Sequence, residues 1–276
     1  MFNKKVYEDA IKNRELIISS CKKNGFYVIE NLIEPKFFQT CRTEAIDFFI
    51  KNALNNKKNL PQAVRGIQLA GDKNTLGFSN NKNWNLYRYC SFRWNQIEET
   101  LENSTLLSRE ISKFRNKLCG YPDSYGELIT KKGFTTYTSL SLYPPGGYLN
   151  FHKDGHGKDG ELELLHFKVE LSKPGIDYEG DGFIIVDNEG NYKLINEYTT
   201  MGDLLLFSGN FSHGIRKINS GFGRIGLFEI PTYVNQQENP LSYSYDEEFS
   251  KKVLRKIIEK WLNFNKKGFE FILRRF

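Results

Sequence analysis

The chain has few of the residues that build disulfide frameworks or cysteine-rich metal sites. Its 276 residues include four cysteines and four histidines. The cysteines, at positions 21, 41, 90 and 119, are far apart and form no C-x-x-C pair. We therefore expect reduced, structural thiols in a cytoplasmic protein.

Long apolar runs are also missing. No uncharged apolar stretch reaches the roughly eighteen residues that a membrane-spanning helix needs, and the N-terminus, M-F-N-K-K-V-Y-E-D-A, lacks the apolar region of a secretory signal. The formal net charge is +6. Solvated lysines are the simplest interpretation of this mild excess, and a preference for anionic substrates is the alternative.

Aromatic residues are abundant, with 22 Phe and 15 Tyr, which favours a β-rich core with aromatic pockets. The length suits a single domain. We expect that domain to span residues 1–276, with a helical and irregular part at 1–133, a β core at 134–231 and a helical extension at 232–276.

The first part alternates apolar periodicity with irregular stretches. Apolar spacing predicts helices over 5–23, 35–54 and 96–118, with a short strand at 26–29. Residues 55–95 are rich in Asn, Gly and Lys, and we expect a long excursion with one or two short strands. Its aromatic residues either shape a pocket or anchor the loop, and Arg88 and Arg93 are candidates for contact with a substrate anion.

From residue 134 the pattern changes to short strands separated by turn residues, which is typical of a sandwich or barrel. The expected strands cover 134–143, 163–171, 182–187, 191–196, 203–207, 212–218 and 223–231. Asp187–Gly190 reads as a hairpin turn. A basic helix is expected at 246–264; it either packs on the domain or binds a membrane surface or a partner.

Three residues with metal-ligating side chains stand out in the β core. His152 and Asp154 are two positions apart, and in an extended strand such residues point to the same side. His213 lies in the strand-like segment F-S-H-G-I. Two histidines and one carboxylate that leave coordination positions open are typical of non-haem Fe(II) oxygenases. His156 and His166 are interpreted as loop and strand residues, with a supporting role near the site as the alternative.

The order H-x-D, a distant histidine and then Arg224 resembles the Fe(II)/2-oxoglutarate-dependent dioxygenase superfamily. The resemblance covers about residues 134–231 and includes the upstream pattern Y-x-x-G-G-x-L-x-x-H-x-D, here 143–154. The helix–strand–helix order at the N-terminus resembles the phytanoyl-type and prolyl-hydroxylase-type branches. This resemblance implies a mainly β fold with flanking helices, whose core is a double-stranded β-helix, the jelly-roll variant of these oxygenases.

The resemblance also implies cofactors and roles. Fe(II) would be held by His152, Asp154 and His213, and O₂ and 2-oxoglutarate would be the co-substrates. Arg224 would pair with the far carboxylate of 2-oxoglutarate, because arginine is permanently charged and forms two parallel hydrogen bonds. Tyr143 and Lys168 are further candidates for contact with 2-oxoglutarate. The candidates for contact with the substrate are Arg216, Arg88 and Arg93.

The implied activity is hydroxylation of an unactivated C–H bond with release of succinate and CO₂. Asp154 favours hydroxylation over halogenation, since related halogenases carry a small residue there. We expect a small polar or anionic metabolite as substrate, such as a sugar acid or an amino acid. The alternatives are a peptide or protein side chain of the prolyl type and a non-catalytic jelly-roll binding module. Nucleic acid is not expected, because Ile230 stands where the demethylase branch carries a second arginine.

Overall fold

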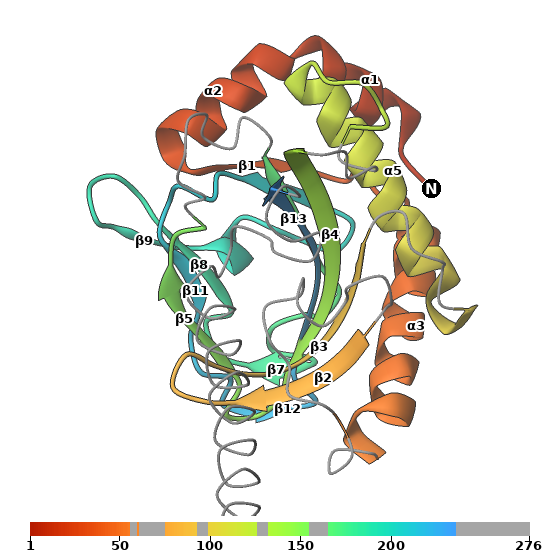
Figure 1. Cartoon of the computed structure of the whole chain (residues 1–276), viewed down its shortest axis with the longest axis vertical. Coiled ribbons are helices and arrows are strands. Elements are labelled where there is room, and N and C mark those ends of the chain that lie inside the picture. Colours follow the sequence, from red (N-terminus) through yellow and green to blue (C-terminus); the bar gives the residue numbers. More distant parts are fainter. Residues whose placement is uncertain (56–59, 61–74, 93–98, 126–131, 155–164, 236–276) are drawn as a thin grey trace, which may run out of the picture.

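The computed structural model describes residues 1–55, 60, 75–92, 99–125, 132–154 and 165–235. Helices α1, α2, α3 and α5 lie together on one side of a curled sheet (Figure 1). Their bounds are Lys4–Lys12 (α1), Arg14–Asn24 (α2), Pro35–Asn52 (α3) and Glu102–Cys119 (α5), and two 3-10 turns cover Glu99–Leu101 (η2) and Ile195–Glu197 (η3). None of these described helices is long and apolar enough to cross a membrane.

The helix ends follow from local chemistry. Asn3 caps α1 by accepting a hydrogen bond from the Val6 backbone N–H. Gly25 and Gly120 end α2 and α5 with positive φ values of 90° and 81°, which glycine adopts without steric cost. The prediction of one helix over 5–23 is wrong. Asn13 ends α1 because its backbone and side-chain N–H groups both donate to the Asp9 carbonyl, and a second helix then begins.

Eleven strands form the main sheet, and all the strand pairings that the structure describes are antiparallel. The strands follow the path β1-β10-β6-β13-β4-β3-β5-β11-β8-β9, and β2 pairs with β3. Figure 1 shows this path curling so that β5, β11 and β8 face β4 and β13 across an interior. The bounds are Phe26–Ile29 (β1), Thr75–Asn80 (β2), Trp84–Phe92 (β3), Lys132–Tyr143 (β4), Tyr148–His152 (β5), His166–Glu170 (β6), Tyr178–Glu179 (β7), Phe183–Val186 (β8), Tyr192–Leu194 (β9), Leu204–Phe207 (β10), His213–Ile215 (β11), Ser220–Gly221 (β12) and Arg224–Asn235 (β13).

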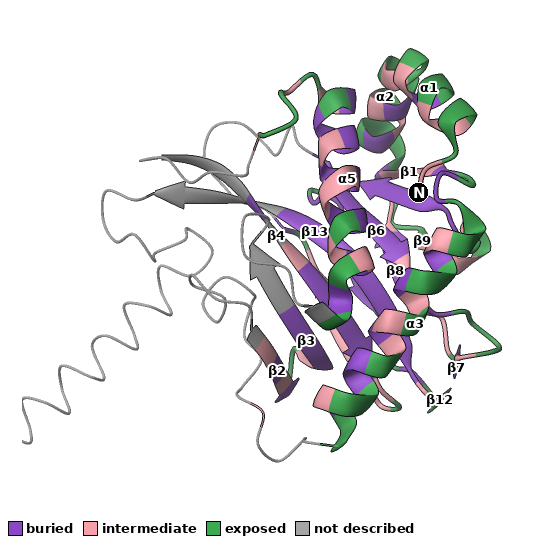
Figure 2. Cartoon of the chain, turned by 90° about the vertical axis from the view of Figure 1, so that its right-hand side faces the viewer, coloured by how far each residue is buried: buried purple, intermediate pink, exposed green. Residues whose placement is uncertain are grey.

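Alternation along the strands creates two separate cores. On β6, Phe167 and Val169 pack toward the helices, whereas His166, Lys168 and Glu170 belong to the opposite, inner face. Helix-facing and inner-facing residues also alternate along β13, β4, β3 and β10. Figure 2 shows that the strands beneath the helices are buried along most of their length. The inner face carries both apolar and charged residues, so the interior of the curl is where a polar site can be built.

The outline of the strands was predicted, but several ends were not. The N-terminal part contributes β1, which pairs with β10 of the core, and β2 and β3, which extend the sheet beside β4. The turn at 187–190 joins β8 and β9 as expected. The helix predicted from residue 96 begins as an α-helix only at Glu102, after the η2 turn. His156, residues 93–98 and the helix expected at 246–264 lie outside the described residues.

Candidate metal and cosubstrate site

Two antiparallel strands bring His152 and His213 together. His152 is the last residue of β5, His213 is the first of β11, and the two are direct register partners. Asp154 follows two positions after the end of β5, so strand pairing does not position it. Its position is set instead by a backbone hydrogen bond of 2.8 Å from the Asp154 N–H to the Gly209 carbonyl.

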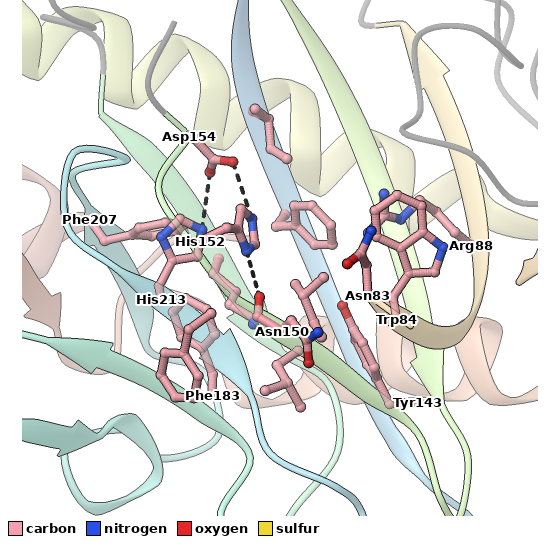
Figure 3. Close-up of a pocket in the computed structure, with 16 residues that line it drawn as sticks. Asn83, Trp84, Arg88, Tyr143, Asn150, His152, Asp154, Phe183, Phe207 and His213 are labelled. Atoms are coloured by element: carbon pink, nitrogen blue, oxygen red, sulfur yellow. Dashed lines mark hydrogen bonds and ion pairs between the residues drawn. The ribbon is translucent and has the colours of Figure 1, made fainter. Parts of the chain in front are cut away.

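The three side chains converge on one point at the wall of the interior (Figure 3). His152 Nε2 lies 3.3 Å from Asp154 Oδ1, and His213 Nε2 lies 3.1 Å from Asp154 Oδ2. One ligand atom from each residue falls within 4.8 Å of the others. Asp154 is 3% exposed. Burial by itself would raise the pKa of this carboxyl, but the charge of His213 and hydrogen bonds from His152 and His213 hold it well below its usual range.

Both imidazoles are oriented through their other nitrogen. His152 Nδ1 lies 2.8 Å from the Asn150 carbonyl, and His213 Nδ1 lies 2.9 Å from the Phe211 carbonyl. A backbone carbonyl can only accept, so each ring donates its Nδ1–H to the backbone and turns its Nε2 atom toward Asp154. Histidines that bind a metal typically donate the N–H of their other ring nitrogen to a neighbouring acceptor in this way.

The triad formed by His152, Asp154 and His213 borders a cavity of about 170 Å³. Figure 3 shows the triad at one wall and Arg88 and Trp84 at the other. Among the described residues the walls combine aromatic rings with two cations, and Asp154 is the single acidic residue that lines them. The lining comprises Asn83, Trp84, Arg88, Tyr143, Leu149, Asn150, Phe151, His152, Asp154, Lys168, Phe183, Phe207, His213, Ile215, Phe228 and Ile230.

Lys168 reaches this cavity from the inner face of β6. Its ammonium lies 3.6 Å from the centroid of the Phe183 ring and 3.5 Å from Glu170 Oε1. Burial, and next the charge of Arg224, lower the pKa of Lys168 well below its ordinary value, although Glu170 opposes this shift. An anion that entered the cavity would favour the charged form of this lysine.

Arg224 is fully buried one layer behind the cavity wall. Its guanidinium forms an ion pair with Glu170 and lies 5.5 Å from the Tyr143 ring and 6.0 Å from the Phe183 ring. Its Nε and Nη1 atoms have no hydrogen-bond partner among the described residues. The preceding Gly223 has φ of 130°, and a Cβ there would lie 2.6 Å from the Tyr143 carbonyl oxygen, so only glycine permits this approach of β13 to β4.

The remaining predicted contacts divide between the cavity and the surface. Tyr143 and Arg88 both line the cavity, and Arg88 hydrogen-bonds to the Tyr143 hydroxyl. Burial raises the pKa of Tyr143, an effect that the charges of Arg88 and Arg224 oppose. Arg216 is half exposed and forms an ion pair of 2.7 Å with Asp181, so the structure does not bring it into the cavity. Arg93 lies outside the described residues.

Sequence reasoning missed the aromatic wall and one polar neighbour. Phe183, Phe207 and Phe228 line the cavity, but in the sequence they look like ordinary strand residues. Glu170 shares the inner face of β6 with Lys168, and the period of two along β6 was the signal that could have found it.

Comparisons with known proteins identify the fold. No protein-family model matches the sequence, and no curated protein matches it. A prolyl hydroxylase from Trichoplax adhaerens, solved with a hypoxia inducible factor peptide fragment, is similar in structure with a TM-score of 0.56 at 16% identity, covering 87% of this chain and 97% of that one.

Two bacterial structures are also similar. A prolyl-4-hydroxylase from Pseudomonas putida has a TM-score of 0.51 at 12% identity and covers 78% of this chain and 96% of that one. A Caulobacter crescentus protein assigned to the 2OG-Fe(II) oxygenase family has a TM-score of 0.52 at 13% identity and covers 90% and 95%. The predicted jelly-roll core is confirmed, and this chain has the fold of the 2-oxoglutarate- and Fe(II)-dependent oxygenases.

Proposed function

We propose that this protein is an Fe(II)/2-oxoglutarate-dependent dioxygenase that hydroxylates an unactivated C–H bond of a small polar or anionic metabolite. The observation that carries the proposal is the convergence of His152, Asp154 and His213, with ligand atoms within 4.8 Å of one another, at the wall of a cavity in a fold of this kind.

The donor set fits ferrous iron. Two imidazole Nε2 atoms and one carboxylate oxygen bind Fe(II) and balance half of its charge, and they leave positions for further ligands. Both Nδ1–H groups are already bonded to backbone carbonyls, so the Nε2 atoms are oriented before a metal arrives.

The interior also fits 2-oxoglutarate. This dianion needs a cation to pair with the carboxylate that is distant from the metal, and Lys168 and Arg224 stand together on the inner face beside Tyr143. The buried Nε and Nη1 atoms of Arg224 have no described partner, which is costly in a dry interior unless an anion supplies one. Lys168 lines the cavity directly, and we assign it the first contact, with Arg224 supporting it from behind.

When bound, Fe(II) and 2-oxoglutarate would use O₂ to hydroxylate the substrate and would release succinate and CO₂. The chain's own contribution is positioning and the exclusion of water. The rings of Phe183, Phe207 and Phe228 enclose the cavity and keep water away from the reacting atoms. Asn83, Asn150 and Trp84 bring hydrogen-bonding groups to the same cavity and are candidates to orient the substrate.

The charge of the cavity supports an anionic substrate. Among the described residues its volume is about 170 Å³. Arg88 lines the wall opposite the triad, with its guanidinium 5.8 Å from the Phe228 ring centroid, and is the cation we assign to an anionic group of the substrate.

The test is succinate formation. The anaerobically purified protein is loaded with Fe(II), supplied with 2-oxoglutarate and air, and assayed for succinate and CO₂. We expect slow turnover without a substrate and none in His213→Ala, which lacks one of the three ligands. Absence of succinate from the wild-type chain, with and without a metabolite extract, would favour a non-catalytic binding module.

The substrate can then be found by comparison. A metabolite extract is incubated with the wild-type chain and with His213→Ala, and compounds that disappear only with the wild type are identified by mass spectrometry. A product 16 mass units heavier than a small metabolite supports the proposal. Oxidation of peptides alone would move the assignment to a peptide side chain.

A further inference from the structure

Two interior cations share a counter-ion that lies between two cavities. Glu170, the last residue of β6, forms an ion pair with Arg224, and its Oε1 atom lies 3.5 Å from the Lys168 ammonium. Lys168 lines the cavity of the triad, whereas Glu170 lines a second cavity of about 500 Å³. This carboxylate therefore holds the two cations that the proposed function assigns to 2-oxoglutarate.

The pairing leaves hydrogen-bonding groups unused on both sides. A strong arginine–carboxylate pair commonly makes two parallel hydrogen bonds. Here Oε1 of Glu170 accepts from Arg224 Nη2 and also pairs with Lys168. Glu170 Oε2 is buried without a hydrogen-bond partner among the described residues, and so are Nε and Nη1 of Arg224. A second carboxylate that engaged more of the guanidinium group would compete effectively with Glu170.

The backbone leaves room for the two cations to meet. Gly226 of β13 is the register partner of Glu170, and a Cβ at Gly226 would lie 3.2 Å from Lys168 Cε and 3.5 Å from Arg224 Nη1. The missing side chain lets cations from neighbouring strands approach each other on the inner face. Because like charges repel in a dry interior, such a pair favours an anion beside it.

We propose that Glu170 determines the affinity for the cosubstrate, because it occupies the position of the far carboxylate of 2-oxoglutarate and must leave Arg224 before that carboxylate binds. This inference rests on the proposed function, since it concerns the cosubstrate of that reaction. The second cavity can receive the displaced side chain. Glu170 already lines it, and Lys173 is the one cation among the described residues around it. The carboxylate thus has a new partner when it leaves the old one.

The proposed role has a distinctive sign. Removal of a carboxylate from beside an anion site raises the affinity for anions, because like charges repel at short range. Loss of Arg224 or Lys168 lowers that affinity instead. A counter-ion that served only the fold predicts equal or weaker anion binding when it is removed, because Arg224 would lose the group that holds its guanidinium in place.

The test uses glutarate and the metal-free protein. Glutarate carries both carboxylates of 2-oxoglutarate but lacks the keto group, so its binding requires neither a metal nor turnover. Isothermal titration calorimetry at millimolar glutarate measures the dissociation constant for the wild-type chain, Glu170→Gln and Glu179→Gln. Glu179 is exposed on β7, so Glu179→Gln is a matched control that removes the same charge from the surface.

We expect the dissociation constant for glutarate to fall roughly tenfold or more in Glu170→Gln and to stay close to that of the wild type in Glu179→Gln. The glutamine keeps an oxygen that can accept from Arg224, and the guanidinium stays charged whatever the protonation state of Lys168. Equal or weaker binding in Glu170→Gln, or no binding to that variant at millimolar glutarate, would overturn the proposal.

Lys173→Met carries the test if Glu170→Gln does not fold. Lys173 is exposed, so its substitution should leave the fold intact while removing the group that receives the displaced carboxylate. Glutarate affinity should fall severalfold in this variant. Lys193→Met removes the same charge at the outer hairpin and should leave the affinity unchanged. Wild-type affinity in Lys173→Met would refute the displacement of Glu170.

The result also separates this inference from the proposed function. A chain that binds glutarate more tightly in Glu170→Gln, yet forms no succinate, supports Glu170 as the competitor of a bound dicarboxylate and refutes the oxygenase. A chain that forms succinate with the same 2-oxoglutarate requirement in the wild type and in Glu170→Gln supports the oxygenase and refutes the role of Glu170.

Discussion

At the scale of single residues, the interior of the sheet holds an unusual row of charges. Lys168 and Glu170 lie two positions apart on the inner face of β6. Arg224 of β13 forms an ion pair with Glu170. All three side chains are at least nine-tenths buried. Buried charges persist only when they are paired or when they serve a ligand. Here Glu170 neutralises one of two cations, so the row as a whole has one positive charge available for an anion.

This row leads to the first prediction. Arg224→Ala and Lys168→Met should each raise the concentration of 2-oxoglutarate needed for half-maximal succinate formation by tenfold or more, since a lost charge-paired contact costs about 1.5–3 kcal/mol. The measurement is a 2-oxoglutarate titration with iron saturating. Lys193→Met is a matched control, because Lys193 pairs with Asp187 at the outer hairpin.

The outcome distinguishes the two cations. If Lys168→Met behaves as the wild type and Arg224→Ala does not, the carboxylate is held by Arg224 alone, after displacement of Glu170. If neither variant changes the titration, the interior row does not bind the cosubstrate.

At the scale of elements, α5 is held on the sheet by a buried ion pair. Arg115 Nη2 lies 2.7 Å from Glu229 Oε1, Ser112 also donates to Glu229, and both charged side chains are fully buried. Glu229 belongs to β13, on the face opposite to Arg224. The helix layer is therefore attached to the same strand that carries the interior arginine.

The second prediction concerns this attachment. Glu229→Leu should lower the free energy of unfolding by about 3–5 kcal/mol, because it leaves Arg115 buried without its partner. Urea denaturation followed by circular dichroism measures the change. The double variant Arg115→Met/Glu229→Leu should recover most of the loss; an equal loss in both variants would show that packing rather than charge is responsible.

At the scale of the whole molecule, the metal ligands come from segments that only the folded sheet brings together. His152 ends β5, Asp154 follows it, and His213 begins β11 after β10 and its loop. Such a site is absent from the unfolded chain, so metal binding must add to the stability of the fold.

The third prediction follows. At a free Mn(II) concentration 100 times the dissociation constant, the folded state gains about 2.7 kcal/mol, which for a chain of this length corresponds to a rise in Tm of roughly 5–10 °C. Differential scanning calorimetry measures the shift, and EDTA should reverse it. His213→Ala should show no shift, and an equal shift in that variant would place the metal elsewhere.

Much of the secondary structure was predictable because it depends on neighbours in the chain. Gly25, Gly120 and the turn at 187–190 act locally, and each ends or joins an element where it was expected. Asn13 misled the prediction because its side-chain bond to Asp9 outweighs a continuous apolar period. The strand at 148–152 is not among the expected strands, because it is positioned by its pairing with β11 and β3, which are distant in the sequence.

The sequence by itself determined the composition of the site: two histidines and an aspartate at a spacing that predicts a metal, and an arginine further along an inner strand. Only the tertiary structure decided which residue faces the cavity and which lies behind it. Lys168 is at the wall, Arg224 is paired with Glu170, Arg216 is at the surface, and His166 contacts Asp154 from behind. The reason is physical. Strand alternation assigns a residue to a face, whereas its partner on that face depends on the register between strands that are distant in the sequence.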